Sequence, residues 1–119
     1  MRTDRLVKAT VAALEDIKAR DIVVLDVRRM ASLFDHVIIA SADSTRQTRA
    51  LARNVQEKIK ALGGKVYGVE GEPVGEWILV DLGAVIVHVM QPAIRQYYNL
   101  EELWGPVGAP RRRGAAARR

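Results

Sequence analysis

Cysteine is absent from this sequence of 119 residues, which excludes disulfides, thiolate metal sites and a cysteine nucleophile. Long hydrophobic runs are missing too, since no apolar stretch approaches the ~18 residues of a membrane span. Residues 1–20 form an amphipathic, mixed-charge stretch that does not resemble a signal peptide. We therefore expect a soluble, cytoplasmic protein of one domain that has no membrane partner.

Acidic residues are missing from the C-terminal end, where none follows Glu102. Five of the 19 basic residues lie in the last nine positions, and without them 14 basic residues balance 14 acidic ones. The net charge of +5 thus belongs to the tail, and a neutral body argues against nucleic-acid binding as the main function. Because residues 105–119 have almost no core-forming side chains, we predict a folded domain over residues 1–104 and a basic, disordered tail over 105–119.

Residues that catalysis requires are also scarce. The histidines are His36 and His88 alone, and no D-x-D pair, G-S turn, P-loop or G-x-S-x-G motif occurs. Asp26, Asp35 and Asp81 stand at or near predicted strand ends, where isolated aspartates are usually turn or cap residues. His88 lies inside an apolar strand and is interpreted as a core or interface histidine with one hydrogen-bond partner. We expect no catalytic residues, no metal and no cofactor.

Hydrophobic periodicity predicts a mixed α/β (α+β) domain. Thr3 is the predicted N-cap of a first helix, and capping residues at 41–45 precede a second helix that stops at Gly63. Two apolar runs hinged at Gly83 predict an antiparallel hairpin. The expected fold is a single domain with a mixed sheet of about five strands flanked by helices. The predicted helices begin at Thr3, near residue 45 and at Pro92, and the strands cover residues 22–27, 37–40, 66–69, 77–82 and 84–90.

The hairpin region carries a specific resemblance. Residues 68–90 read G-V-E-G-E-P-V-G-E-W-I-L-V-D-L-G-A-V-I-V-H-V-M, and residues 95–104 read R-Q-Y-Y-N-L-E-E-L-W. Upstream, residues 21–27 read D-I-V-V-L-D-V, and residues 32–47 read S-L-F-D-H-V-I-I-A-S-A-D-S-T-R-Q. These separated motifs resemble, in order and spacing, the Iojap-like ribosomal silencing factors. The resemblance covers roughly residues 3–104.

The resemblance implies a fold similar to nucleotidyltransferases but without their catalytic acids. It also implies binding to protein fourteen of the large ribosomal subunit, at the face where the small subunit docks. A protein bound there would block subunit joining and repress translation, and would not be an enzyme. Two alternatives stay open, namely a ribosome assembly factor that binds ribosomal RNA and a degenerate nucleotidyltransferase. The tail either contacts ribosomal RNA through Arg111, Arg112 and Arg113 or only keeps the protein soluble.

Motif matching assigns partner-binding roles to residues of the hairpin and of the last helix. Trp77 is the expected aromatic anchor, because tryptophan and tyrosine are typical binding anchors. An apolar sheet face that docks a partner could also pair with itself, which would give a homodimer. The chain departs from the family at Ala84, where an aspartate is usual, and at Phe34, where a small or hydroxyl residue is common. The residues carried over are Trp77, Leu79, Val80, Asp81, Leu82, Arg95 and Tyr98.

Overall fold

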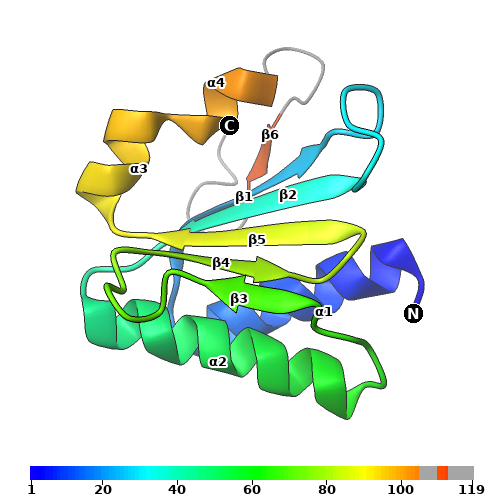
Figure 1. Cartoon of the computed structure of the whole chain (residues 1–119), viewed down its shortest axis with the longest axis horizontal. Helices are drawn as coiled ribbons and strands as arrows, with labels where there is room; N and C mark the ends of the chain where they lie inside the picture. The colour runs from blue at the N-terminus through cyan, green and yellow to red at the C-terminus, as the bar shows by residue number, and fades with distance from the viewer. Residues whose placement is uncertain (105–109, 113–119) are drawn as a thin grey trace.

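A computed structural model describes residues 1–104 and 110–112 of the chain. It is a single mixed α/β layer structure, as the sequence predicts (Figure 1). The helices are α1 (Thr3–Asp16), α2 (Thr45–Ala61), α3 (Pro92–Tyr98) and α4 (Leu100–Trp104). The strands are β1 (Arg20–Asp26), β2 (His36–Ser41), β3 (Gly68–Glu70), β4 (Trp77–Asp81), β5 (Val85–Met90) and β6 (Pro110–Arg112).

The six strands form one sheet in the order β3-β4-β5-β2-β1-β6. All neighbours pair antiparallel except β2 and β5, which are parallel, so the sheet is mixed. The predicted hairpin of β4 and β5 is present, and Leu82 N donates to Val85 O at 2.9 Å across its turn. Gly83 occupies that turn at φ +85°, a left-handed conformation that glycine adopts without a Cβ clash.

The two faces of the sheet are covered unequally. Helices α1 and α2 lie along one face, and α3 and α4 lie over part of the other (Figure 1). Between the sheet and α1 and α2 lies the larger of two hydrophobic clusters, which includes Leu14, Ile38, Leu51 and Val87, all fully buried. A smaller cluster on the other face, around Leu25 and its neighbours, packs against residues of α3 and α4. One face of the sheet is thus covered by α1 and α2, whereas the other face is covered only in part by α3 and α4.

Helix ends follow local chemistry with one exception. Ser44 caps α2, because its Oγ accepts a hydrogen bond from Gln47 N at 3.1 Å. Thr3, in contrast, is already the first residue of α1, and the N-cap Arg2 makes no side-chain cap bond. Thr3 Oγ1 instead donates to Asp35 Oδ2 at 3.4 Å. The prediction that Thr3 caps α1 is therefore wrong, since its hydroxyl ties the helix to the start of β2.

Three residues of the predicted tail belong to the described part of the chain. Residues Pro110–Arg112 form β6, which pairs antiparallel with β1 and places Arg111 opposite Val24 and Arg112 opposite Val23. This pairing adds a sixth strand to the five predicted. Arg113 and the rest of the tail lie outside the described residues.

Candidate docking surface

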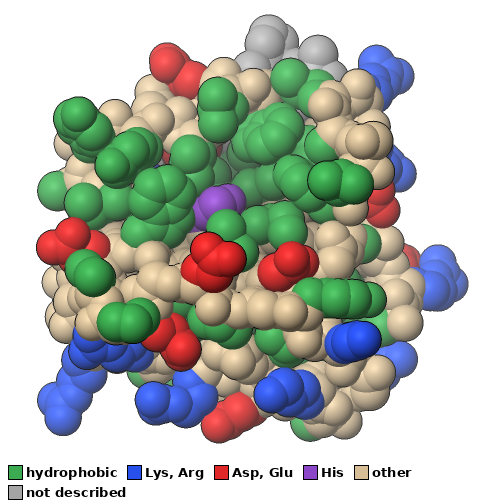
Figure 2. Space-filling model, in the orientation of Figure 1, with side chains coloured by type: hydrophobic (Ala, Val, Ile, Leu, Met, Phe, Trp, Pro, Cys, Tyr) green, Lys and Arg blue, Asp and Glu red, His purple; other side chains and the backbone are tan. Residues whose placement is uncertain are grey.

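Strands β4 and β5 leave part of one sheet face accessible. Along β4, Ile78 and Val80 are fully buried beneath α1 and α2, whereas the alternate positions are partly exposed. The partly exposed positions of β5 pair with those of β4, so both sets point to the same side. We call this surface the open face, and it comprises Trp77, Leu79, Asp81, Ile86, His88 and the adjoining Tyr98 of α3. Figure 2 shows hydrophobic side chains gathered in a band around one histidine.

Aromatic rings form one end of the open face. The centroids of Trp77 and Tyr98 lie 4.9 Å apart at an interplanar angle of 48°, and Tyr97 meets Tyr98 edge-on at 5.0 Å. Tyr98 is 52% exposed and Tyr97 is 81% exposed. Such rings bring a large apolar area with little rotamer freedom to lose, which suits them to partner binding.

The side chain of His88 fixes the position of the Trp77 indole through a hydrogen bond. Trp77 Nε1 donates a hydrogen bond to His88 Nδ1 at 3.0 Å, and the two ring centroids are 5.9 Å apart. Burial lowers the pKa of His88 to about 4, because the charged imidazolium would lose its hydration. His88 is therefore neutral at physiological pH, and the expected single hydrogen-bond partner is Trp77.

Acidic side chains border the apolar band. Glu70 of β3 is the cross-strand partner of Leu79, and Asp81 of β4 is the partner of Ile86, so both carboxylates share the side of the open face. Asp81 Oδ1 also accepts a hydrogen bond from Gly83 N at 2.8 Å and so stabilises the hairpin turn. Figure 2 shows acidic side chains along the edge of the hydrophobic band. The open face is thus an apolar surface with a negative margin.

Three residues that motif matching assigned to partner binding have other places in the structure. Val80 is fully buried and Leu82 is 3% exposed, and both belong to the core cluster beneath α1 and α2. Their side chains therefore support the open face and do not form it. Arg95 is 8% exposed, and its Nη1 donates to Asp21 O and to Ser41 Oγ, both at 2.7 Å. Its Nη2 donates to Glu101 Oε2 at 2.9 Å, so Arg95 joins α3, α4 and the sheet.

Sequence reasoning missed two features of the open face. His88 was interpreted as a core or interface histidine but was not placed among the partner-binding residues, although its register opposite Leu79 places it in the middle of the open face. The loop before β4 was also unassigned, and α2 holds it in place. Arg49 donates to the carbonyl oxygens of Glu72 and Pro73 at 3.0 and 2.8 Å, and Thr48 Oγ1 donates to Gly75 O. The side chains of Thr48 and Arg49 on α2 were the sequence features from which this attachment of the loop could have been predicted.

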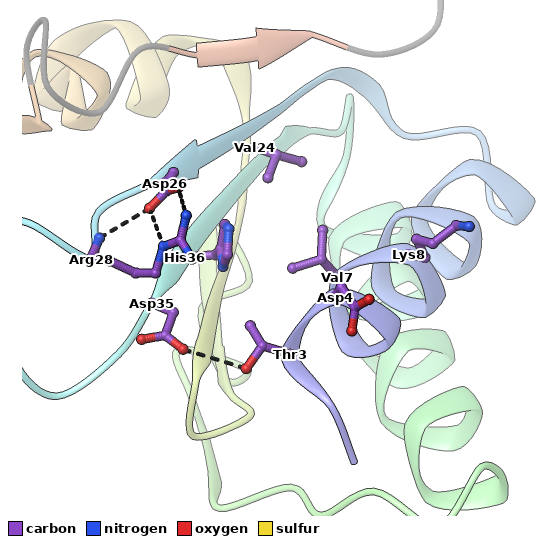
Figure 3. Close-up of a pocket in the computed structure, with 9 residues that line it drawn as sticks. All are labelled: Thr3, Asp4, Val7, Lys8, Val24, Asp26, Arg28, Asp35 and His36. Atoms are coloured by element: carbon purple, nitrogen blue, oxygen red, sulfur yellow. Dashed lines mark hydrogen bonds and ion pairs between the residues drawn. The ribbon is translucent and has the colours of Figure 1, made fainter.

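A second concave site lies between the start of α1 and the adjoining ends of β1 and β2 (Figure 3). It has a volume of about 460 Å³ and includes the strand-end carboxylates Asp26 and Asp35. Arg28 binds Asp26 through two hydrogen bonds of 3.0 and 2.5 Å and lowers the pKa of that carboxyl to about 2. The two carboxylates thus already have protein partners, Arg28 and Thr3. Within the described residues no group of three or more histidine, cysteine or acidic side chains could hold a metal ion.

No helix in the described ranges has both the length and the apolar character that crossing a membrane requires. The fold and the open face together define a class, namely a small α/β domain that exposes an apolar, aromatic part of its sheet. Comparisons with known proteins identify the family within that class. A family model described as "Ribosomal silencing factor during starvation" matches residues 1–117.

Individual relatives agree with the family model. The chain is 50% identical over 105 residues to the ribosomal silencing factor RsfS of Chromobacterium violaceum, which covers 88% of this chain and 86% of that protein. It is 42% identical to RsfS of Haemophilus influenzae over 83% of this chain and 97% of that protein. A crystal structure of a Chromobacterium violaceum protein superposes with a TM-score of 0.87 at 49% identity, covering 98% and 97% of the two chains. This chain belongs to the ribosomal silencing factor family.

Proposed function

We propose that this protein docks through its open face on the large ribosomal subunit and thereby blocks joining of the small subunit, which represses translation. The observation that carries the proposal is the open face itself, an accessible aromatic and apolar sheet surface in a chain of the silencing factor family. The proposed partner at the subunit is ribosomal protein fourteen. The proposed place of action is the cytoplasm.

The chemistry of the open face suits such a partner. Leu79 and Ile86 supply apolar area around the rings of Trp77 and Tyr98, and the rings are the expected centre of the binding energy. Ribosomal proteins are rich in basic side chains, which would meet the carboxylates of Glu70 and Asp81 at the margin. Opposite charges at a rim mainly speed association and fix orientation, while the apolar centre slows dissociation.

The proposed mechanism is steric occlusion and involves no catalytic step. A docked domain needs only to occupy space that the small subunit requires, so repression depends on affinity and concentration. The paired state of Asp26 and Asp35 favours this mechanism over nucleotidyl transfer, which needs carboxylates available to magnesium.

The tail has a separate proposed role. Pairing of β6 with β1 places Arg111 and Arg112 on one edge strand of the sheet, and β3 is the other edge strand. We propose that these residues and Arg113 contact ribosomal RNA, releasing counterions from its phosphates. Deletion of residues 105–119 should then flatten the dependence of subunit binding on salt. An unchanged slope would mean that the tail does not touch RNA.

Co-sedimentation with separated ribosomal subunits tests the main proposal. Wild-type protein should pellet with large subunits and not with small ones, and should inhibit subunit joining. Trp77→Ala should lose both activities, whereas Glu57→Ala, on the exposed side of α2, should retain them. Failure of the wild-type protein to bind large subunits would overturn the proposal. Sedimentation equilibrium of the free protein would show whether the open face pairs with a second copy instead.

A further inference from the structure

His88 has a chemical role that its burial alone does not explain. It lies between Leu79 of β4 and Ile39 of β2 in the register of the sheet, near the middle of the open face. Its ring is partly exposed, unlike the fully buried side chains of Val87 and Val89 on either side of it. A polar group at this position is surrounded by apolar side chains.

The contact with Trp77 fixes which nitrogen of His88 carries the proton. An indole N–H can only donate, so the His88 Nδ1 that lies 3.0 Å from Trp77 Nε1 must offer its lone pair. A neutral imidazole has one N–H and one lone pair, and its N–H is therefore on Nε2. Burial keeps the ring neutral, because it lowers the pKa of His88 to about 4.

The Nε2–H group has no acceptor within the described part of the molecule, since the hydrogen bond to Trp77 is the one bond that His88 makes there. Water can reach the partly exposed ring in the free protein. A partner that covers the open face would remove that water, and a buried donor left without an acceptor is costly.

We infer that His88 presents its Nε2–H as a hydrogen-bond donor at the centre of the open face, and that the partner supplies an acceptor oxygen at that point. This inference rests on the proposed docking through the open face. The acceptor is a backbone carbonyl or a side-chain oxygen, because lysine and arginine side chains cannot accept a hydrogen bond. The partner's basic groups would then meet the carboxylates at the margin, and its acceptor oxygen would meet His88. These two contacts together would specify the orientation of docking.

Two substitutions, each of which mimics one ring nitrogen of His88, test the roles of the two nitrogens individually. Asparagine can place its amide oxygen near the position of Nδ1 and so keep the bond from Trp77, but it is too short to donate where Nε2 does. Glutamine can place its amide N–H near the position of Nε2, but it loses the acceptor for Trp77. We expect His88→Asn to bind isolated large subunits about tenfold more weakly than wild type, and at least about threefold more weakly than His88→Gln. Equal affinities for the two variants, or the reverse order, would overturn the inference.

Nuclear magnetic resonance of the ¹⁵N-histidine-labelled full chain tests the same point without a substitution. The free protein should show the Nε2–H tautomer of His88, and binding of isolated ribosomal protein fourteen should slow exchange of that proton with water. A proton on Nδ1, or exchange that complex formation leaves unchanged, would contradict the inference even if the variants fail to fold. Loss of wild-type binding to large subunits would instead defeat the proposed docking itself, so the two failures are distinct.

Discussion

The ring of Trp77 lies 4.9 Å from the ring of Tyr98, and this contact joins strand β4 to helix α3. Trp77 is also fixed by its hydrogen bond to His88, so its indole is oriented before any partner arrives. An anchor that is already held in position loses less conformational entropy on binding. The open face is therefore best understood as a prearranged surface in which α3 and the sheet contribute jointly.

Replacement of Tyr98 should weaken binding to the large subunit. Tyr98→Ala removes a half-exposed ring that packs on Trp77, and we expect a loss of about 2 kcal/mol, or roughly 30-fold in affinity. Tyr98→Phe keeps the ring and should bind nearly as well as wild type. Tyr67→Ala is a matched control, because Tyr67 is 61% exposed but borders a hollow with Leu6 and Leu82 on the helix-covered side. Titration of labelled protein with large subunits gives the affinities, and equal losses for Tyr98→Ala and Tyr67→Ala would argue against an aromatic hot spot.

Arg95 should matter for stability before it matters for binding. Arg95→Ala leaves Glu101, Ser41 and the carbonyl of Asp21 without their partner in a nearly buried site, and we expect a loss of about 3 kcal/mol in the free energy of unfolding. Urea unfolding followed by circular dichroism measures the change. Arg28→Ala is the control, because it breaks an ion pair at the surface and should have a much smaller effect. If Arg95→Ala unfolds like wild type but binds large subunits poorly, the result would support the direct contact with the partner that motif matching suggested.

The sequence predicted most of the fold because cap and turn residues mark the ends of its helices and strands clearly. Ser44 and Gly63 delimit α2, and Gly83 allows the hairpin turn, so each boundary has a local chemical cause. Thr3 was assigned wrongly because a threonine near a helix start has two uses, and its contact with Asp35 spans 32 positions of sequence. Strand β6 was not predicted, since pairing with the edge of β1 depends on tertiary structure and not on apolar periodicity.

The candidate site was predicted less completely than the fold. Motif matching selected Trp77, Leu79 and Asp81 together with Val80, although side chains alternate along a strand and Val80 must point the other way. Alternation alone would have removed Val80 from the accessible set. The burial of Arg95 depends on Asp21 and Ser41, which are 74 and 54 positions away, so no local pattern reveals it.

Stability should depend on pH through His88. The folded pKa of about 4 lies below the ordinary value of 6.5, so the unfolded chain binds more protons between these values. The contribution of neutral His88 to the free energy of unfolding is therefore fully present above about pH 6.5. It is lost as the pH falls toward 4, and the loss amounts to about 3 kcal/mol. His88→Gln should show a shallower loss of unfolding free energy over this range, measured by urea titrations at several pH values. Parallel pH profiles for the two proteins would show that His88 is not the group responsible.

The negative margin should act mainly on association. Glu70 is exposed and shares the side of Leu79, so Glu70→Lys should slow association with large subunits several-fold and weaken its salt dependence. Dissociation should change little, because the apolar centre is intact. Glu57→Lys makes the same charge change on the outer side of α2 and serves as the control. Stopped-flow mixing of labelled protein with large subunits measures both rates, and equal slowing by the two variants would indicate a net-charge effect without a localised margin.

The family resemblance of the hairpin motif leads us to expect an aspartate where this chain has Ala84, and the surroundings of Ala84 indicate that the difference does not reach the partner. Ala84 O accepts hydrogen bonds from Asp35 N and His36 N at 2.7 and 3.1 Å, which fix the start of β5 against β2. Its side chain packs against the cluster beneath α1 and α2, away from the open face. We therefore expect Ala84→Asp to change affinity for the large subunit less than about threefold, in the same titration used for Tyr98. A gain of tenfold or more would show that a carboxylate at this turn contacts the partner, and that the docked area extends past the hairpin turn.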